Sequence, residues 1–180
     1  MSWHAEGHDS EWPFDLFATT FNLDPSVTGL LVVDMQGSDC SIDPHSAFAS
    51  QYPKIAAYWN ERMRGVVIPN IRRLLEAFRG AGQHVVYTRN GRITAHGKEL
   101  TRRLWRPVET DDPPRYRGTS AYDIMPELAP RSDELVVDKL TSGAFNASIL
   151  DHSLRNMGIR DLVIVGISSD MCVLGTARVA

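Results

Sequence analysis

The chain has 180 residues, of which 43% are hydrophobic, and its formal net charge is −3. This length and composition suit one α/β domain with a sizeable core and exclude a disordered chain. The slightly acidic balance gives no electrostatic basis for binding nucleic acid or an anionic membrane. No apolar run is long enough to span a bilayer, so we expect neither a nucleic-acid nor a membrane partner.

The N-terminal segment, residues 1–23, is polar and aromatic, and it has no basic stretch followed by an apolar one. It is therefore not a signal peptide. Cys40 and Cys172 form no Cys-x-x-Cys pair, and both are expected to be free thiols in a reducing compartment. The sequence predicts a cytoplasmic protein, with an N-terminal arm at residues 1–28 and one domain at residues 29–180.

Four short apolar runs are typical of buried parallel strands, because they are rich in Val, Leu and Ile without clean alternation. They are residues 29–35 (GLLVVDM), 83–88 (QHVVYT), 134–138 (ELVVD) and 161–165 (DLVIV).

Helical patterns lie between these runs. Residues 66–81 place apolar side chains on one face, and Pro69 fits a first turn, so a regular helix is expected to begin near it and to stop at Gly82. Residues 147–157 form a second amphipathic pattern that stops at Gly158, and residues 170–180 begin another helix.

Alternating strands and helices predict an α/β fold, a doubly wound, Rossmann-like parallel sheet flanked by helices. Residues 90–133 differ, because they hold Arg, Trp and Tyr around Pro113-Pro114. We interpret them as a long loop with one short helix, and loops of this length are often functional.

Ligands of open parallel sheets bind at the carboxyl ends of the strands. Asp34 lies near the end of the first predicted strand, Arg89 follows the second, Lys139 follows the third, and residues 168–172 follow the fourth. The topology therefore brings an acid, two bases and a thiol to one edge of the sheet. Taken alone, an Asp, a Lys or a Cys at such a position is more often a turn residue, a solvated side chain or core packing.

Three blocks carry a family resemblance: LLVVDMQ, VVDKLTSGAFNAS and VIVGISSDMCVLGTARVA. In order and spacing they resemble the signature blocks of the isochorismatase-like cysteine hydrolases, over residues 29–180. The pattern Gly166-x-x-Ser169-x-x-Cys172-Val173, with Thr176-Ala177 behind it, is the most specific part. The resemblance implies that Asp34, Lys139 and Cys172 form a catalytic triad.

The chemistry of these residue types agrees with that role. A thiol is a weak nucleophile until it becomes a thiolate, and a helix N-terminus together with Lys139 would favour the thiolate of Cys172. Asp34 would accept the thiol proton and later deliver it to a leaving amine. Backbone N–H groups of Met171 and Cys172 would receive the oxyanion. The resemblance further implies a cis peptide after Ile167, which would turn the backbone donor of Ser168 into the pocket.

Other residues leave two interpretations open. Arg89 either binds a substrate carboxylate or caps a helix. Trp105, Tyr116 and Phe145 either line the pocket or anchor loops. Cys40 lies in a polar stretch, GSDCSIDP, and is not expected to take part in the chemistry.

We expect no cofactor and no catalytic metal. Nicotinamidases, which are similar in these blocks, carry an Asp-x-His and a further His for a metal, but this chain reads TRNGRITAH after its second strand. Asp43-Pro44-His45 lies in the wrong block, and no ligand cluster has suitable spacing.

The leading functional hypothesis is a hydrolase that cleaves a C–N bond of a small-molecule amide or ureide through a cysteine thioester. Alternatives are an isochorismate-type hydrolase, which cleaves a vinyl ether with Asp34 as acid, and a non-catalytic binding subunit. Several vinyl-ether hydrolases of this kind lack the cysteine, so Cys172 favours the amidohydrolase.

The last block ends early in its helix, where members of the family continue into further strands. We therefore expect a sheet of four strands with an open edge, in a chain that is truncated at its C-terminus or completed by a partner. A homo-oligomer is expected, with the aromatic N-terminal arm as a candidate contact.

Overall fold

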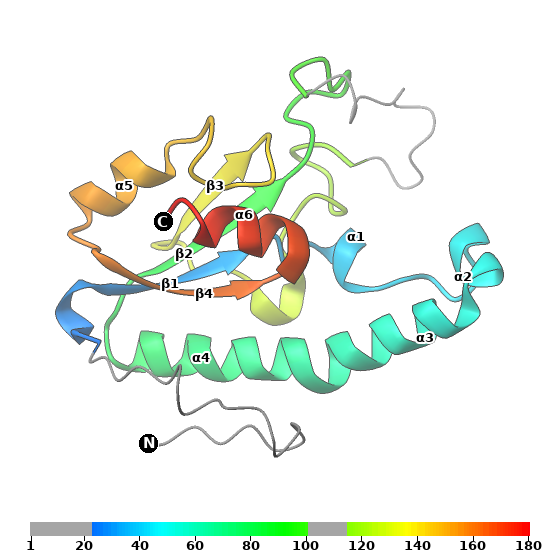
Figure 1. Cartoon of the computed structure of the whole chain (residues 1–180), viewed down its shortest axis with the longest axis horizontal. Coiled ribbons are helices and arrows are strands. Elements are labelled where there is room, and N and C mark those ends of the chain that lie inside the picture. Colours follow the sequence, from blue (N-terminus) through cyan, green and yellow to red (C-terminus); the bar gives the residue numbers. More distant parts are fainter. Residues whose placement is uncertain (1–22, 101–114) are drawn as a thin grey trace, which may run out of the picture.

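The computed structural model describes residues 23–100 and 115–180. Within them, four parallel strands form a sheet in the order β3-β2-β1-β4, with helices on both faces (Figure 1). The predicted doubly wound α/β fold is confirmed, and each strand overlaps the range expected for it. The strands are β1 (Thr28–Val33), β2 (Val85–Asn90), β3 (Leu135–Lys139) and β4 (Asp161–Gly166).

β1 lies inside the sheet between β2 and β4, and all six of its residues are buried. Its alternate side chains serve two cores, which explains an apolar run without alternation. One core contains Leu30 and Val32 and lies under α4 (Ile68–Gly80), whereas the other contains Leu31 and Val33 and lies under α5 (Leu150–Asn156).

The helix over the first core is longer than its sequence pattern predicted. α3 (Pro53–Arg62) continues through a π-helical turn, η3 (Met63–Val67), into α4 (Figure 1). The α-helix α4 begins at Ile68 with Pro69 in its first turn, as expected, but the helical segment that precedes it was not predicted. Pro69 has no N–H to donate, and the wider turn before it, where the N–H of Ile68 donates to the carbonyl of Met63, accommodates the ring inside a continuous helix.

Both predicted glycine stops are confirmed. Gly82 and Gly158 have φ of +68° and +74°. At each helix end, the N–H of the glycine and the N–H of the residue after it donate to carbonyls of the last helical turn, which is the Schellman pattern. The start of α5 differs from the prediction, because Ala147 has φ +53° and lies outside the helix, which begins three residues later.

The remaining elements are short. In the described part of residues 90–133, the predicted long loop holds one 3-10 turn, η5, and bridges Gln36 to Ile124 and Arg92 to Tyr116. No helix in the two described stretches is long and apolar enough to cross a membrane. The short elements are η2 (Pro25–Val27), α1 (Gly37–Cys40), α2 (Ala47–Gln51), η5 (Pro126–Leu128), η6 (Ser169–Val173) and α6 (Leu174–Ala177).

β3 and β4 form the two edges of the described sheet. All six residues of β4 are half-exposed, in contrast to the buried β1 beside it. The expected open edge is therefore present at β4 in the part of the chain that the structure describes.

Gly166 brings the end of β4 against β1. Its φ is +127°, and a Cβ at this position would lie 2.0 Å from the carbonyl oxygen of Val33. Only a residue without a side chain allows this approach. The segment that follows β4 therefore starts beside the end of β1, next to Asp34.

We predict that Gly166→Ala destabilises the fold far more than Gly158→Ala. Both positions have positive φ, but a Cβ at Gly158 meets nothing within 4 Å. The control should lose about 1–2 kcal/mol of unfolding free energy from the backbone conformation alone. The test variant should lose more than about 3 kcal/mol, because β1 or β4 must move. Urea unfolding measures both, and equal losses would contradict the steric explanation.

Candidate active site

The structure brings Asp34, Lys139 and Cys172 together at the carboxyl edge of the sheet. Asp34 follows β1, Lys139 is the last residue of β3, and Cys172 lies in η6 behind β4. The chain adds β2 and β3 on one side of β1 and β4 on the other, so the ends of β1 and β4 flank the point where the strand order reverses. This point is the usual ligand site of open α/β sheets.

Asp34 leaves the sheet by a sharp backbone turn. Its φ is +53°, in the left-handed region that Asp tolerates better than most residues. The residue is only 3% exposed, and its carboxylate is held by Thr88, whose Oγ1 donates to Oδ1 at 2.7 Å. The turn therefore places a buried carboxylate at the sheet edge.

Lys139 is fully buried, whereas the other two lysines, Lys54 and Lys98, are exposed. Its Nζ lies 2.8 Å from Oδ2 of Asp34 and donates to the carbonyls of Thr141 at 2.9 Å and Ser142 at 3.2 Å. The contact with Oδ2 is an ion pair, since its angles do not make a hydrogen bond. A buried ammonium requires such partners.

Cys172 completes the group, with its Sγ 3.4 Å from Nζ of Lys139. Thr176 fixes the backbone around it: its Oγ1 donates to the carbonyl of Cys172 at 2.7 Å and accepts from the N–H of Ala144 at 3.1 Å. This explains the Thr behind the cysteine in the sequence pattern, because it joins the cysteine turn to the loop after Lys139.

The electrostatics of the thiol differ from the expectation of a stabilised thiolate. Burial is the main cause that raises the pKa of Cys172 to about 11; the charge of Asp34 raises it further, and Lys139 opposes both. The expectation was wrong because it left out desolvation and the nearby carboxylate. The thiol is therefore protonated near neutral pH and requires a base, and Asp34 is adjacent.

Backbone hydrogen bonds near Cys172 already engage one of the N–H groups expected to bind the oxyanion. The Ile167–Ser168 peptide is cis, as the resemblance implied. The carbonyl of Ser168 accepts from the N–H of Met171 at 3.2 Å and from that of Val173 at 3.1 Å. Met171 is therefore already engaged inside the turn, so its part in the predicted oxyanion site requires that it give up this bond. The roles of Ser168 and Cys172 stay predictions.

Arg89 lies at the end of β2 and pairs with carboxylates. Its Nε is 2.8 Å from Asp138 and its Nη1 is 2.9 Å from Asp123, and the guanidinium lies 5.0 Å from the ring centre of Tyr122. Of its two predicted roles, capping a helix is not supported, because Nε and Nη1 donate to side-chain carboxylates and not to carbonyls at a helix end. Binding a substrate carboxylate stays a prediction and would require Arg89 to release one of these partners.

The two predicted aromatic residues that the structure describes, Phe145 and Tyr116, have different surroundings. Phe145 is half-buried and packs against the α5-side core, where it lines a second cavity with Val27 and Leu154. Tyr116 forms the bridge with Arg92, and Trp105 lies outside the described residues. Their contact with substrate stays a prediction.

Cys40 is not in an exposed polar loop. It ends α1, is 2% exposed and belongs to the core under α4, and burial raises the pKa of its thiol to about 12. Both cysteines are free thiols. Within the described residues, no three His, Cys, Asp or Glu side chains are grouped to hold a metal.

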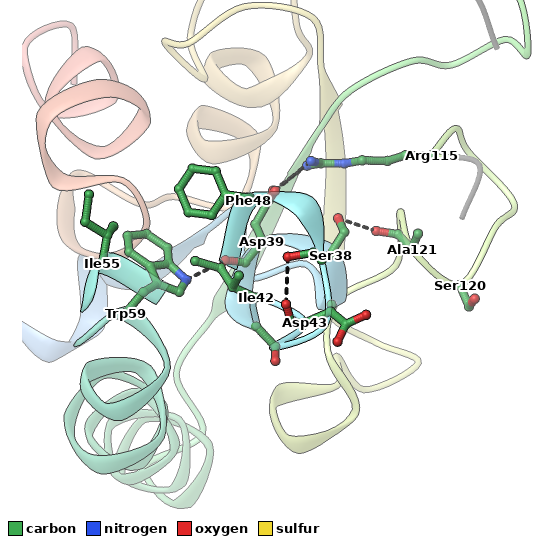
Figure 2. Close-up of a pocket in the computed structure, with 13 residues that line it drawn as sticks. Ser38, Asp39, Ile42, Asp43, Phe48, Ile55, Trp59, Arg115, Ser120 and Ala121 are labelled. Carbon is green, nitrogen blue, oxygen red and sulfur yellow. Dashed lines mark hydrogen bonds and ion pairs between the residues drawn. The ribbon is translucent and has the colours of Figure 1, made fainter. Parts of the chain in front are cut away.

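A cavity of about 920 Å³ lies beside α1, and Figure 2 shows its lining. Phe48, Ile55 and Trp59 lie on one side of it, and Arg115 pairs with Asp39 on the other. None of the three triad residues lines this cavity. The cavity lies beside the segment that follows Asp34, and it is separate from the group formed by Asp34, Lys139 and Cys172.

Comparison with known proteins agrees with the observed fold. The Isochorismatase domain family model matches residues 28–180, so this chain belongs to the isochorismatase family. The resemblance identified from the three sequence blocks is thereby confirmed.

Two relatives share a name. Ureidoacrylate amidohydrolase RutB from Acinetobacter baylyi is 30% identical, over 87% of this chain and 65% of the relative. RutB from Agrobacterium fabrum is 32% identical, over 87% of this chain and 70% of that protein. The chain thus spans about two thirds of the length of these relatives.

Solved structures give the same fold. A cysteine hydrolase from Pseudomonas syringae pv. phaseolicola is similar with a TM-score of 0.67 and 27% identity, covering 88% of this chain and 68% of that one. An isochorismatase family protein from Burkholderia thailandensis gives a TM-score of 0.61 at 25% identity, with 87% and 72% covered.

We predict that iodoacetamide alkylates Cys172 faster than Cys40, and that the Cys172 rate keeps rising with pH. The thiolate is the reacting form, so below a pKa of about 11 the rate should increase roughly tenfold per pH unit. Cys40 should lag because it is more buried and its pKa is about 12. Peptide mass spectrometry assigns the label. A plateau in the Cys172 rate near neutral pH would show a stabilised thiolate instead.

Proposed function

We propose that this chain hydrolyses a C–N bond of a small amide or ureide through a thioester on Cys172. The observation that carries the proposal is the buried series of contacts from Oδ2 of Asp34 to Nζ of Lys139, at 2.8 Å, and on to Sγ of Cys172, at 3.4 Å. A nucleophile, a base and a fixed positive charge are thus adjacent. The names of the RutB relatives support a ureide as substrate.

In the proposed first half-reaction, Asp34 accepts the thiol proton as Sγ attacks the carbonyl carbon. The backbone N–H groups of Ser168 and Cys172 receive the oxyanion, with Met171 joining them if it releases Ser168. Asp34 then gives the proton to the departing nitrogen, the C–N bond breaks, and a thioester remains.

In the second half-reaction, water attacks the thioester and Asp34 accepts one of its protons. The C–S bond breaks, the sulfur regains its proton, and the acid is released. Lys139 keeps its charge throughout and offsets the negative charge that passes between Asp34 and sulfur. One water is consumed, and ammonia or an amine and an acid are formed.

We predict that Cys172→Ala lowers kcat for ammonia release from a panel of amides and ureides by about a thousandfold or more, because no thioester can form. Asp34→Asn should be similarly severe, since the same carboxylate serves as base and acid. Cys40→Ala is the matched control and should stay within about threefold, because Cys40 lies in the core away from the triad.

The outcome separates the proposed mechanism from vinyl-ether hydrolysis. Cys172→Ala activity within about tenfold of wild type, a barrier change of about 1.4 kcal/mol, would contradict the thioester and favour acid catalysis by Asp34.

The same assay with EDTA tests the expected absence of a metal. Loss of turnover that zinc or iron restores would contradict it.

We also propose that the chain forms a homo-oligomer. Besides the N-terminal arm, whose aromatic residues lie outside the described ranges, residues 47–62, which form α2, α3 and the joint between them, carry large apolar side chains that are 43–66% exposed. Exposed apolar patches of this kind often mark interfaces. These side chains are Phe48, Tyr52, Ile55 and Tyr58.

Replacing Ile55 and Tyr58 together by Glu should lower the mass measured by light scattering to that of one chain. The exposed side chains contribute little to the fold, so circular dichroism should be unchanged. A wild-type mass of one chain would refute the oligomer, and an unchanged mass in the variant would refute this surface. Deleting residues 1–21 tests the arm separately.

A further inference from the structure

We infer that Thr88 is a positioning residue for Asp34: it holds the carboxylate so that one oxygen, Oδ2, is left to accept the thiol proton. This inference rests on the proposed function, because a base of defined orientation matters only if Asp34 moves protons. Thr88 was missed in the sequence because it stands in the apolar run QHVVYT, where the pattern indicates only a strand.

Thr88 binds Asp34 at two points. Its Oγ1 donates to Oδ1 at 2.7 Å, and its carbonyl oxygen accepts the N–H of Asp34 at 3.1 Å. Thr88 is fully buried, on the strand between β1 and β3. One residue therefore fixes both the backbone of Asp34, which has the unusual φ of +53°, and its side chain.

The two carboxylate oxygens consequently have different surroundings. Oδ1 is occupied by the threonine hydroxyl. Oδ2 is buried, lies 2.8 Å from Nζ of Lys139, and has no hydrogen-bond partner among the described residues. Lys139 in turn contacts the sulfur of Cys172. Oδ2 is thus the oxygen that no described donor occupies, and it lies against the same ammonium that contacts the sulfur.

Loss of the hydroxyl would leave Oδ1 without its donor, whereas the contact of Oδ2 with Lys139 does not involve Thr88. The carboxylate would then lose its fixed orientation, so kcat should fall while KM stays nearly unchanged, and a variant that keeps the hydroxyl should restore kcat. A threonine that only stabilises the fold would not give this combination.

The test compares Thr88→Val, which keeps the shape but removes the hydroxyl, with Thr88→Ser, which keeps the hydroxyl. Thr88→Val should lower kcat by about 10–100-fold, as is typical when a partner that orients a reactive group is lost. KM should change by less than about threefold, because substrate binding does not depend on the orientation of the base. Thr88→Ser should restore kcat to within about threefold.

Thr28→Val is the matched control, since Thr28 is also a buried threonine, 5% exposed, whose hydroxyl donates to the carbonyl of Asp24 at the opposite end of β1. Its kcat and KM should match wild type. Urea unfolding checks each variant. If Thr88→Val does not fold, Thr88→Ala provides the same comparison with Thr88→Ser.

Two outcomes would overturn the inference. If Thr88→Val keeps the wild-type kcat while Cys172→Ala is inactive, Thr88 does not position the base, and the proposed function stands. If wild type releases no product from any amide or ureide in the panel, the proposed function falls and the inference falls with it.

Discussion

The ion pair between Asp34 and Lys139 lies out of water, with 3% and 0% of the two residues exposed. Burying each charge costs several kcal/mol, which mutual attraction offsets only with good geometry and further hydrogen bonds. The surroundings supply these: the hydroxyl of Thr88 for the carboxylate, and the carbonyls of Thr141 and Ser142 for the ammonium. Since apolar residues of similar size would often be equally stable, such a pair is poorly explained by stability alone.

The same ion pair also affects the pKa of the Cys172 thiol. Sγ of Cys172 meets a positive and a negative charge whose effects on its pKa oppose each other, so desolvation decides the direction and the thiol stays protonated. In the proposed mechanism, the sulfur becomes nucleophilic only when Asp34 takes its proton, so deprotonation would be coupled to attack. The same carboxylate would then be available to protonate the leaving nitrogen.

The strands and the meeting of the three residues could be predicted from the sequence because they depend on apolar runs and on a topological rule. The long helix could not, because α3 buries only Ala56 of its ten residues and so has little apolar periodicity. The burial of Cys40 and the raised pKa of Cys172 depend on segments that close over them from elsewhere in the chain. Thr88 contributes a polar atom to an otherwise apolar strand, and nothing in a strand pattern indicates which neighbour it contacts.

The sequence block around Cys172 connects this residue to the segments that carry both charged residues, Asp34 and Lys139. Gly166 lies against Val33, directly before Asp34, and Thr176 binds Ala144 in the loop after Lys139. A Cβ at Gly143 in that loop would lie 3.0 Å from the carbonyl oxygen of Gly175, so the two backbones pack closely. Each contact requires a specific small or hydroxyl-bearing residue. Because the cysteine turn is held on one side to the strand before Asp34 and on the other to the loop after Lys139, the position of Sγ follows that of the ion pair.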